Sequence, residues 1–390
     1  GVTTSHLRFG DNQIRSPYLV NTPDFVACHV PAYLDKYDML RGLKKGGTFL
    51  LNSIWNAEET KNHLPDYMKK YMADNDINFY IINATEIAEE IGLGGRTNTI
   101  MQSTFFKISE VIPYATAVDY MKKAVVKDFG RKGEEIVKMN HAAIDRGGEA
   151  VKVEIPEEWK SIEVVAAHVE NDAPDFIKNV VEPINAMKGD LLPVSAFLGR
   201  EDGTFPAGTT AYEKRGIAVN VPKWVSDNCI QCNQCAYVCP HACIRPFLID
   251  EEEMKGLPVG TPALKAIPKT FEGLKFRIQL SPLDCTGCGN CVDVCPAKTK
   301  ALVMEPLESQ MEQNDLWNVI SKSVSYKDTI VSKEQNVKNS QFAQPLFEFS
   351  GACSGCGETP YIKLITQLYG DRMMVANATG CSSIYGGSAP

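Results

Sequence analysis

The amino-acid sequence predicts a multidomain protein of the α/β class. Its length of 390 residues exceeds one typical domain and suggests two to four. Its composition, 44% hydrophobic and 23% charged residues, is typical of a soluble globular protein with a sizeable core. Apolar strand patterns alternate with amphipathic helix patterns through residues 1–168, which indicates βαβ units and a mainly parallel sheet.

Three apolar runs in this first region have the length of buried strands, and several other segments have helical spacing. The expected strands are 25–30, 48–54 and 78–83. The expected helices are 32–43, 57–73, 84–91, 117–129 and 134–146. From about residue 151 to 220 proline and glycine interrupt the pattern, so we expect a connector with little regular structure there.

Charge and cysteine usage narrow the class of partner and the compartment. A net charge of -8 argues against nucleic acid or an acidic membrane surface as the main partner. We expect no membrane span, because apolar runs stay well below roughly 18 residues, and no secretory signal is evident. Twelve of the 13 cysteines follow residue 228 in metal-type spacings, which predicts a reducing, cytoplasmic location. A first residue Gly1 and a last residue Pro390 in a glycine-rich turn predict an internal segment of a longer polypeptide.

Two cysteine runs carry the strongest chemical signal. They are Cys229-x2-Cys232-x2-Cys235-x3-Cys239-Pro240 and Cys285-x2-Cys288-x2-Cys291-x3-Cys295-Pro296. This spacing is typical of 4Fe–4S clusters, because a tight loop offers three thiolates to one cubane and a fourth lies beyond the turn. Zinc ribbons and disulfides are the alternatives. Zinc gives no reason for a third regularly spaced cysteine or for the repeated Cys-Pro ending.

In two-cluster ferredoxins the fourth cysteine of each run crosses to the other cluster. We therefore predict two clusters, one on Cys229, Cys232, Cys235 and Cys295, the other on Cys285, Cys288, Cys291 and Cys239. The two runs are separated by 45 residues, more than a minimal ferredoxin needs. This insertion must fold outside the cluster loops, and we expect its charged stretches, 251–253 and 265–277, to form a solvated face, with a docking surface for a partner as the alternative.

The last segment carries a Cys353-x2-Cys356 pair and, later, Cys381. By spacing alone these are three ligands of a site that lacks its fourth. A zinc site, a redox dithiol and a third iron–sulfur cluster with an off-chain fourth thiolate all remain open. For Cys28 and Cys243 we expect structural, buried roles, with a spare thiol near a cluster as the alternative for Cys243.

Four motifs carry a resemblance to a known family. They are the stretches 1–10 (GVTTSHLRFG), 95–102 (GRTNTIMQ), 353–361 (CSGCGETPY) and 379–387 (TGCSSIYGG). In this order the sequence resembles pyruvate:ferredoxin (flavodoxin) oxidoreductase over its full length. The resemblance implies a coenzyme A-associated α/β domain at 1–168, incomplete at its N-terminus, and a small connecting domain at 169–208. It further implies a ferredoxin-type domain with two 4Fe–4S clusters at 209–327 and the start of an α/β thiamine diphosphate-binding domain at 328–390.

The same resemblance implies roles for individual residues. Cys353, Cys356 and Cys381 would hold a third 4Fe–4S cluster, and Glu358 and Cys381 would lie near thiamine diphosphate. From the residues alone, the favoured interpretation of Glu358 is an acid that caps a helix beginning at Thr359. Asn98 becomes a candidate contact of coenzyme A. The glycines just before it, at 92–95, fail the dinucleotide pattern and are typical of a helix C-cap.

The implied activity is oxidative decarboxylation of pyruvate with coenzyme A to acetyl-CoA and carbon dioxide. Electrons would pass from thiamine diphosphate through three clusters to ferredoxin or flavodoxin. The resemblance places the catalytic residues and the Mg²⁺ ligands outside this segment, and it implies a homodimer. Two other interpretations are the same chemistry on another 2-oxo acid and an electron-transfer subunit without catalysis of its own.

Overall fold

The computed structural model describes residues 3–10, 12–15, 19–164 and 173–387. The chain divides into two compact units, Val2–Asn171 and Asp172–Pro390. The expected domain boundary between residues 168 and 169 lies outside the described residues. Within the described ranges, no helix is both long and apolar enough to cross a membrane.

The first unit is built on a four-stranded sheet in the order β1-β2-β3-β4. Its strands are β1 (Phe25–Cys28), β2 (Thr48–Asn52), β3 (Asn78–Ile82) and β4 (Val151–Val153). Strands β1, β2 and β3 run parallel, as the alternating sequence pattern predicts, and β4 pairs antiparallel with β3 at the edge. The strand β4 falls in the stretch expected to be connector.

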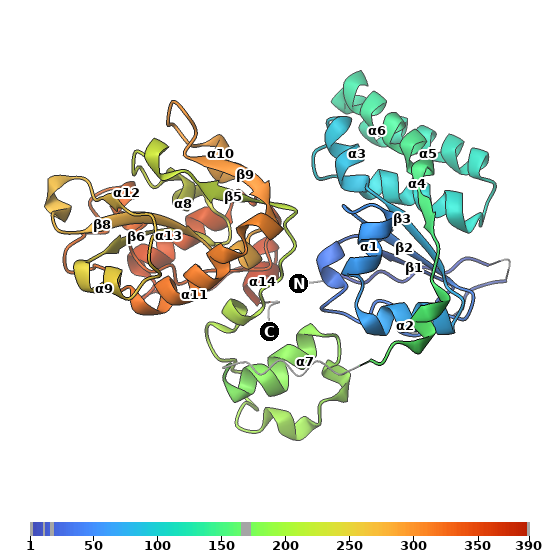
Figure 1. Cartoon of the computed structure of the whole chain (residues 1–390), viewed down its shortest axis with the longest axis horizontal. Coiled ribbons are helices and arrows are strands. Elements are labelled where there is room, and N and C mark those ends of the chain that lie inside the picture. The colour runs from blue at the N-terminus through green and yellow to red at the C-terminus, as the bar shows by residue number, and fades with distance from the viewer. Residues whose placement is uncertain (1–2, 11, 16–18, 165–172, 388–390) are drawn as a thin grey trace. The chain divides into compact units, whose positions relative to one another are not determined.

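Helices cover both faces of this sheet (Figure 1). They are α1 (Ala57–His63), α2 (Asp66–Asp74), α3 (Ala84–Glu90), α4 (Asn98–Ser109), α5 (Tyr114–Phe129) and α6 (Glu134–Arg146). Phe49 and Leu51 pack with α2 on one face, whereas Leu50 packs with α3, α4 and α6 on the other. This alternation follows from the two-residue period of side chains along a strand. The sequence predicted α3, α5 and α6, but not α4.

The helix expected at 32–43 is wrong. The chain there forms a 3-10 turn, Pro31–Tyr33, followed by irregular turns. The hydroxyl of Tyr67 donates to the carbonyl oxygens of Leu34 and Tyr37, at 3.1 and 3.0 Å. These bonds from a neighbouring helix satisfy carbonyls that a local helix would otherwise pair. Tertiary contacts thus replace the helix that the apolar spacing indicates.

The single helix expected at 57–73 is two helices. Asn56 caps α1 through a capping box with Glu59. Leu64 is extended, with ψ of 134°, and Pro65 then starts α2. The proline explains the break, because it disfavours the helical conformation of the residue before it.

The described residues of the second unit form two small antiparallel sheets. One pairs β5 (Asn220–Trp224) with β9 (Leu302–Pro306), and the other has the order β6-β8-β7, with β6 (Ile244–Ile249), β7 (Leu264–Lys265) and β8 (Lys275–Leu280). Its helices are α7 (Glu182–Asn185), α8 (Gln234–Val238), α9 (Glu251–Lys255), α10 (Asn290–Asp293), α11 (Glu312–Ser323), α12 (Val337–Ser340), α13 (Thr359–Tyr369) and α14 (Cys381–Gly387). One π-turn, Ile177–Val181, precedes α7.

The insertion between the two cysteine runs forms the β6-β8-β7 sheet. The hydrophobic core of this sheet also includes residues that precede and follow the insertion in the sequence. Phe276 of β8 packs in one hydrophobic cluster with Trp317 of α11 and with Phe342 and Phe349 from beyond residue 328. Because these aromatic side chains are buried together, the cysteine runs and the segment that carries Cys353 share one core.

The expectation that the charges of the insertion form a solvated face is wrong for two residues. Arg277 is 2% exposed, bonds Gln279 and the carbonyl oxygen of Pro262, and has its pKa lowered to about 10 by burial. Glu253 is ion-paired with the buried Lys327 at 2.6 Å. Residues Glu251 and Glu252 are exposed, as expected.

Candidate iron–sulfur sites

The first pocket of interest gathers the first tetrad, which we define as Cys229, Cys232, Cys235 and Cys295. Cys229 and Cys232 come from the loop that leads into α8, Cys235 lies in α8 itself, and Cys295 comes from the end of the other run. Apolar side chains of Trp224, Ile278 and Leu302 complete the wall. The four thiols therefore surround one apolar cavity, and the chain crosses between the runs to close it.

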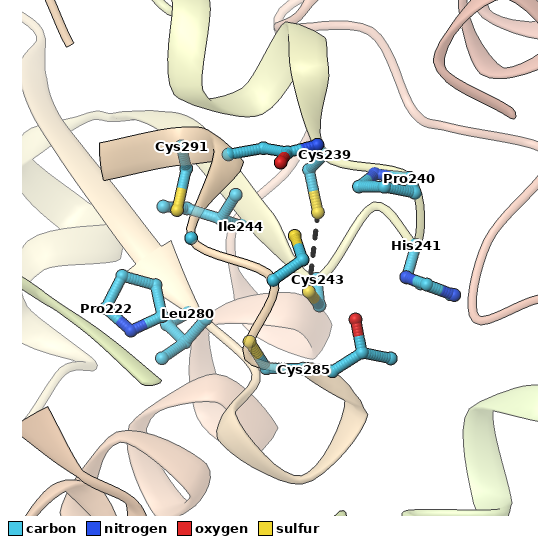
Figure 2. Close-up of a pocket in the computed structure, with 13 residues that line it drawn as sticks. Pro222, Cys239, Pro240, His241, Cys243, Ile244, Leu280, Cys285 and Cys291 are labelled. Atoms are coloured by element: carbon cyan, nitrogen blue, oxygen red, sulfur yellow. Dashed lines mark hydrogen bonds between the residues drawn. The ribbon is translucent and has the colours of Figure 1, made fainter. Parts of the chain in front are cut away.

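The second pocket gathers the second tetrad, Cys239, Cys285, Cys288 and Cys291. Figure 2 shows the thiols of Cys239, Cys285 and Cys291 around a common space, with Leu280 and Pro222 on its apolar side. Again one cysteine, Cys239, comes from the other run. Both groupings are the ones expected from the crossed pattern of two-cluster ferredoxins.

The cysteine loops repeat one backbone conformation. In each of the three cysteine loops, the third residue of the first Cys-x2-Cys has a left-handed φ, which is 58° for Gln231, 68° for Gly287 and 72° for Gly355. Glycine adopts this conformation readily. Gln231 is held there by its side-chain amide, which donates to the carbonyl oxygen of Lys265 and accepts from the amide of Ile267, at 2.8 and 3.0 Å. The repeated turn is what aims successive thiols toward one point.

The donors around the thiols fit an anionic cluster. The backbone amide of Gly287 donates to the sulfur of Cys285, and that of Ala301 to the sulfur of Cys295, each at 3.4 Å. Burial raises the pKa of Cys235 and Cys291, because a buried thiolate is unfavourable without a positive charge beside it. Apolar walls and amide donors are the surroundings that tune iron–sulfur clusters.

The number of thiols in each pocket also bears on what would fill it. Each tetrad supplies four thiols, which is the number of ligands taken by a tetrahedral zinc ion and also by a 4Fe–4S cubane. Among the described residues, no group of three or more His, Cys, Asp or Glu side chains is arranged to hold a metal ion.

The third cysteine group, which we define as Cys353, Cys356 and Cys381, is more exposed to solvent than the two tetrads. Cys353 and Cys381 are exposed, and Cys356 is half-buried just before α13. Burial acts to raise the pKa of Cys356, but hydrogen bonds from the backbone amides of Thr359 and Glu358 outweigh it and lower that pKa. A thiolate at the start of a helix is a ready metal ligand.

Glu358 occupies the N-cap position of α13 but makes no capping hydrogen bond with its side chain. Its carboxylate instead lies near the phenol of Tyr385 in α14, and so do Cys356 and Cys381. Burial, together with the nearby Glu358, raises the pKa of Tyr385 to about 12. The structure thus brings Cys356, Glu358 and Cys381 around Tyr385, a residue that the sequence interpretation missed.

The loop 353–356 contacts the second tetrad directly. The hydroxyl of Ser354 donates to the carbonyl oxygen of Thr286, at 3.2 Å. Gly355 lies beside Cys288, since an added Cβ would be in ordinary contact with the Cβ of that cysteine, at 3.5 Å, and the amide of Gly355 donates to the thiol of Cys288. The third cysteine group is therefore the neighbour of the second tetrad.

Lys363 of α13 is a second residue that the sequence interpretation missed. Its ammonium group is buried and donates to the carbonyl oxygens of Ala236, Tyr237 and Cys239. Burial, the largest influence, lowers its pKa to about 8. A signal was present, since Lys363 lies four residues after the buried Thr359 and four before the buried Gln367, on the inner face of the helix.

Asn98 lies in the other compact unit, as the exposed first residue of α4. The glycines before it end α3, with Gly92 at φ of 81° and the amide of Leu93 bonded to Ala88, as expected for a helix C-cap.

The two remaining cysteines are buried, as expected. Cys28 closes strand β1 and donates to the carbonyl oxygen of Val30, and burial raises its pKa to about 11. Cys243 also lines the second pocket, with its sulfur 3.4 Å from that of Cys239 (Figure 2). This hydrogen bond lowers the pKa of Cys239 and raises that of Cys243.

Comparison with known proteins identifies the family. A family model for pyruvate ferredoxin/flavodoxin oxidoreductase matches residues 1–150, a domain of unknown function matches 163–218, and a 4Fe-4S dicluster domain matches 228–299. The pyruvate-flavodoxin oxidoreductase of Enterobacter agglomerans is 56% identical over 391 residues, which cover 100% of this chain and 33% of the relative. The pyruvate:ferredoxin oxidoreductase of Moorella thermoacetica is 54% identical, and the pyruvate-flavodoxin oxidoreductase of Klebsiella pneumoniae is 52% identical, with the same shares covered.

The chain thus spans about a third of the length of these curated relatives and matches them from its first residue to its last. All eight cysteines of the two tetrads fall within the matched dicluster domain. By its sequence over the whole chain, this protein belongs to the pyruvate:ferredoxin/flavodoxin oxidoreductase family.

Proposed function

We propose that this chain is part of an enzyme that oxidatively decarboxylates pyruvate, delivers the acetyl group to coenzyme A, and reduces ferredoxin or flavodoxin. One observation supports it above the others. Two tetrads of thiols line apolar cavities, and the loop that carries Cys353 and Cys356 is hydrogen-bonded, through Ser354 and Thr286, to the loop of the second tetrad. A pure electron carrier has no need for this third group beside a carboxylate such as Glu358.

The contacts support an order for the electron path. Ser354 and Gly355 connect the third cysteine group to the second tetrad. Electrons would enter at Cys353, Cys356 and Cys381, pass through the second tetrad, and leave from the first. The amides that bond to the sulfurs of Cys285 and Cys295 would stabilise the negative charge that each electron adds.

The organic cofactor would adjoin the entry point of this path. Thiamine diphosphate, when bound, supplies the electron sink that decarboxylation of a 2-oxo acid requires. We propose Glu358 and Cys381 as residues that adjoin it, and Asn98 as a contact of coenzyme A. The ligands of Mg²⁺ and the pocket for pyruvate would lie outside this chain, which is why no catalytic residue is assigned within it.

The domain organisation that goes with this function has four parts. They are a coenzyme A-associated domain at 1–168, a connecting domain at 169–208, a ferredoxin-type domain at 209–327 and the start of a thiamine diphosphate-binding domain at 328–390. We further propose a cytoplasmic homodimer whose partners are pyruvate, coenzyme A and the electron acceptor, and neither nucleic acid nor a membrane.

Anaerobic analysis of the holoenzyme tests this proposal. Three 4Fe–4S clusters require about twelve iron and twelve sulfide per polypeptide. Addition of pyruvate and coenzyme A should reduce added ferredoxin or flavodoxin and yield acetyl-CoA. If another 2-oxo acid but not pyruvate supports reduction of the acceptor, the proposed substrate is wrong and the proposed chemistry stands. If the iron content is full but no 2-oxo acid supports reduction of the acceptor, the protein is an electron-transfer subunit without catalysis of its own.

A further inference from the structure

The side chain of Lys363 stands out among the buried charges of the second unit. It is 2% exposed, and the structure pairs it with no carboxylate of the described residues. The other buried lysine of this region, Lys327, has the opposite arrangement, with its ammonium 2.6 Å from the carboxylate of Glu253. A buried cation without a counter-charge is strongly unfavourable, so it calls for an anion nearby.

The surroundings of the ammonium show where that anion would lie. Its three acceptors are carbonyl oxygens at the end of α8, the short helix that runs from Cys235 of the first tetrad toward Cys239 of the second. The sulfurs of Cys239 and Cys235 are close enough to act on the ammonium electrostatically. Arg245, another cation whose charge acts on Lys363, is already paired with Glu348.

We propose that Lys363 is the buried counter-charge of the ferredoxin-type clusters and that it raises the midpoint potential of the cluster on the second tetrad. This proposal rests on the proposed function, which places iron–sulfur clusters in the two cavities. Four thiolates around a cubane leave a net negative charge, and reduction adds to it. A fixed positive charge in a region of low dielectric favours the reduced form.

The position of Lys363 gives this charge a second consequence. Lys363 belongs to α13, which begins three residues after Cys356 of the third cysteine group. The same ammonium therefore joins the segment that receives electrons to the tetrad that accepts them next. When that tetrad holds its anionic cluster, the contact is stabilised, so loading of the cluster also secures α13 against α8.

The competing interpretation is that Lys363 only caps the carbonyls of α8. Lys363→Gln keeps hydrogen-bond donors without the charge, Lys363→Met removes both, and Lys363→Arg keeps the charge. Lys327→Gln is the matched control, because it replaces another buried lysine of the same unit that is ion-paired with Glu253. Each variant is made in the holoenzyme, and iron content is measured first. An iron content below about eight in the parent protein counts against the proposed function itself.

Redox titration followed by electron paramagnetic resonance then separates the two interpretations. In Lys363→Gln we expect the equilibrium constant for reduction of the second-tetrad cluster to fall about tenfold, a decrease of about 59 mV for one electron. The first-tetrad cluster should shift less, and Lys363→Arg and Lys327→Gln should titrate like the parent. An unchanged potential in Lys363→Gln with full iron content overturns the proposal.

Loss of iron is informative as well. If Lys363→Gln and Lys363→Met lose the second-tetrad cluster while Lys363→Arg retains it, the requirement is for charge, and the proposal stands. If Lys363→Arg loses the cluster equally, the requirement is for lysine geometry, and the counter-charge role is rejected. Pyruvate-dependent activity of the parent protein is measured in parallel, so the failure of either proposal is recognised separately.

Discussion

The imidazole of His241 donates from Nε2 to the carbonyl oxygen of Ala352, at 3.0 Å. His241 follows Cys239 by two residues, and Ala352 immediately precedes Cys353. The ring is 1% exposed, and burial lowers its pKa, so it stays neutral at pH 7 and keeps its donor proton. This bond joins the second tetrad to the third cysteine group at a point separate from the contact of Ser354 with Thr286.

Removal of one cysteine of the third group should remove one cluster and leave the other two. Cys356→Ser should reduce the iron content of the holoenzyme from about twelve to about eight per polypeptide and spare the two ferredoxin-type signals. Electron exit should slow because the entry point is lost. Cys28→Ser, in the other unit, is the control and should keep all iron. Unchanged iron in Cys356→Ser would mean that Cys356 binds no cluster.

Glu358 predicts an effect on thiamine diphosphate. Because its carboxylate makes no helix-capping bond, Glu358→Gln should leave α13 intact and the stability unchanged. Binding or activation of thiamine diphosphate should weaken at least several-fold, as measured by titration of the full-length enzyme from which thiamine diphosphate has been removed. Exposed Glu312, in the first turn of α11, provides the control as Glu312→Gln. Parent-like binding would leave Glu358 without a role at the cofactor.

The second cysteine run is expected to require glycine at position 287. Its φ is 68°, and an added Cβ would lie 2.9 Å from the carbonyl oxygen of Asn220. Gly287→Ala should therefore cost more than the roughly 1–2 kcal/mol of a left-handed residue. Gly289→Ala is the matched control, with φ of 77° and open space around the Cβ. We expect the unfolding free energy and iron retention to fall further in Gly287→Ala, and equal losses would show that the close approach is tolerated.

The ion pair of Glu253 with Lys327 predicts a pH dependence of stability. Burial acts to raise the pKa of Glu253, but bonds from Lys327 and Ser325 dominate and lower it from 4.5 to about 2. A lowered folded-state pKa means that the stabilisation is fully present above pH 4.5 and is lost as the pH falls toward 2. The difference in unfolding temperature between the parent and Glu253→Gln should shrink over that range. Glu252→Gln, at an exposed pair with Lys255, should show little difference at any pH.

Much of the fold follows from local patterns. The parallel strands at 25–28, 48–52 and 78–82 were predicted within two residues, because an apolar run between polar turns has few other stable arrangements. The helix at 32–43 failed because the hydroxyl of Tyr67, distant in sequence, satisfies the carbonyls of Leu34 and Tyr37. The prediction that Arg277 is exposed failed because hydropathy takes no account of hydrogen-bond partners such as Gln279, which satisfy a charged side chain when it is buried.

The site divides in the same way. The sequence alone determined which cysteines form each candidate tetrad, because the x2 spacing is a property of a single short loop and the crossed pattern follows from the repeat. Only the tertiary structure decided that the third cysteine group adjoins the second tetrad. It also decided that Lys363 and His241 lie beside the second tetrad and that Tyr385 lies beside the third cysteine group. Contacts between Lys363 and Cys239 span 124 residues, and no local pattern of side chains encodes a contact over that separation.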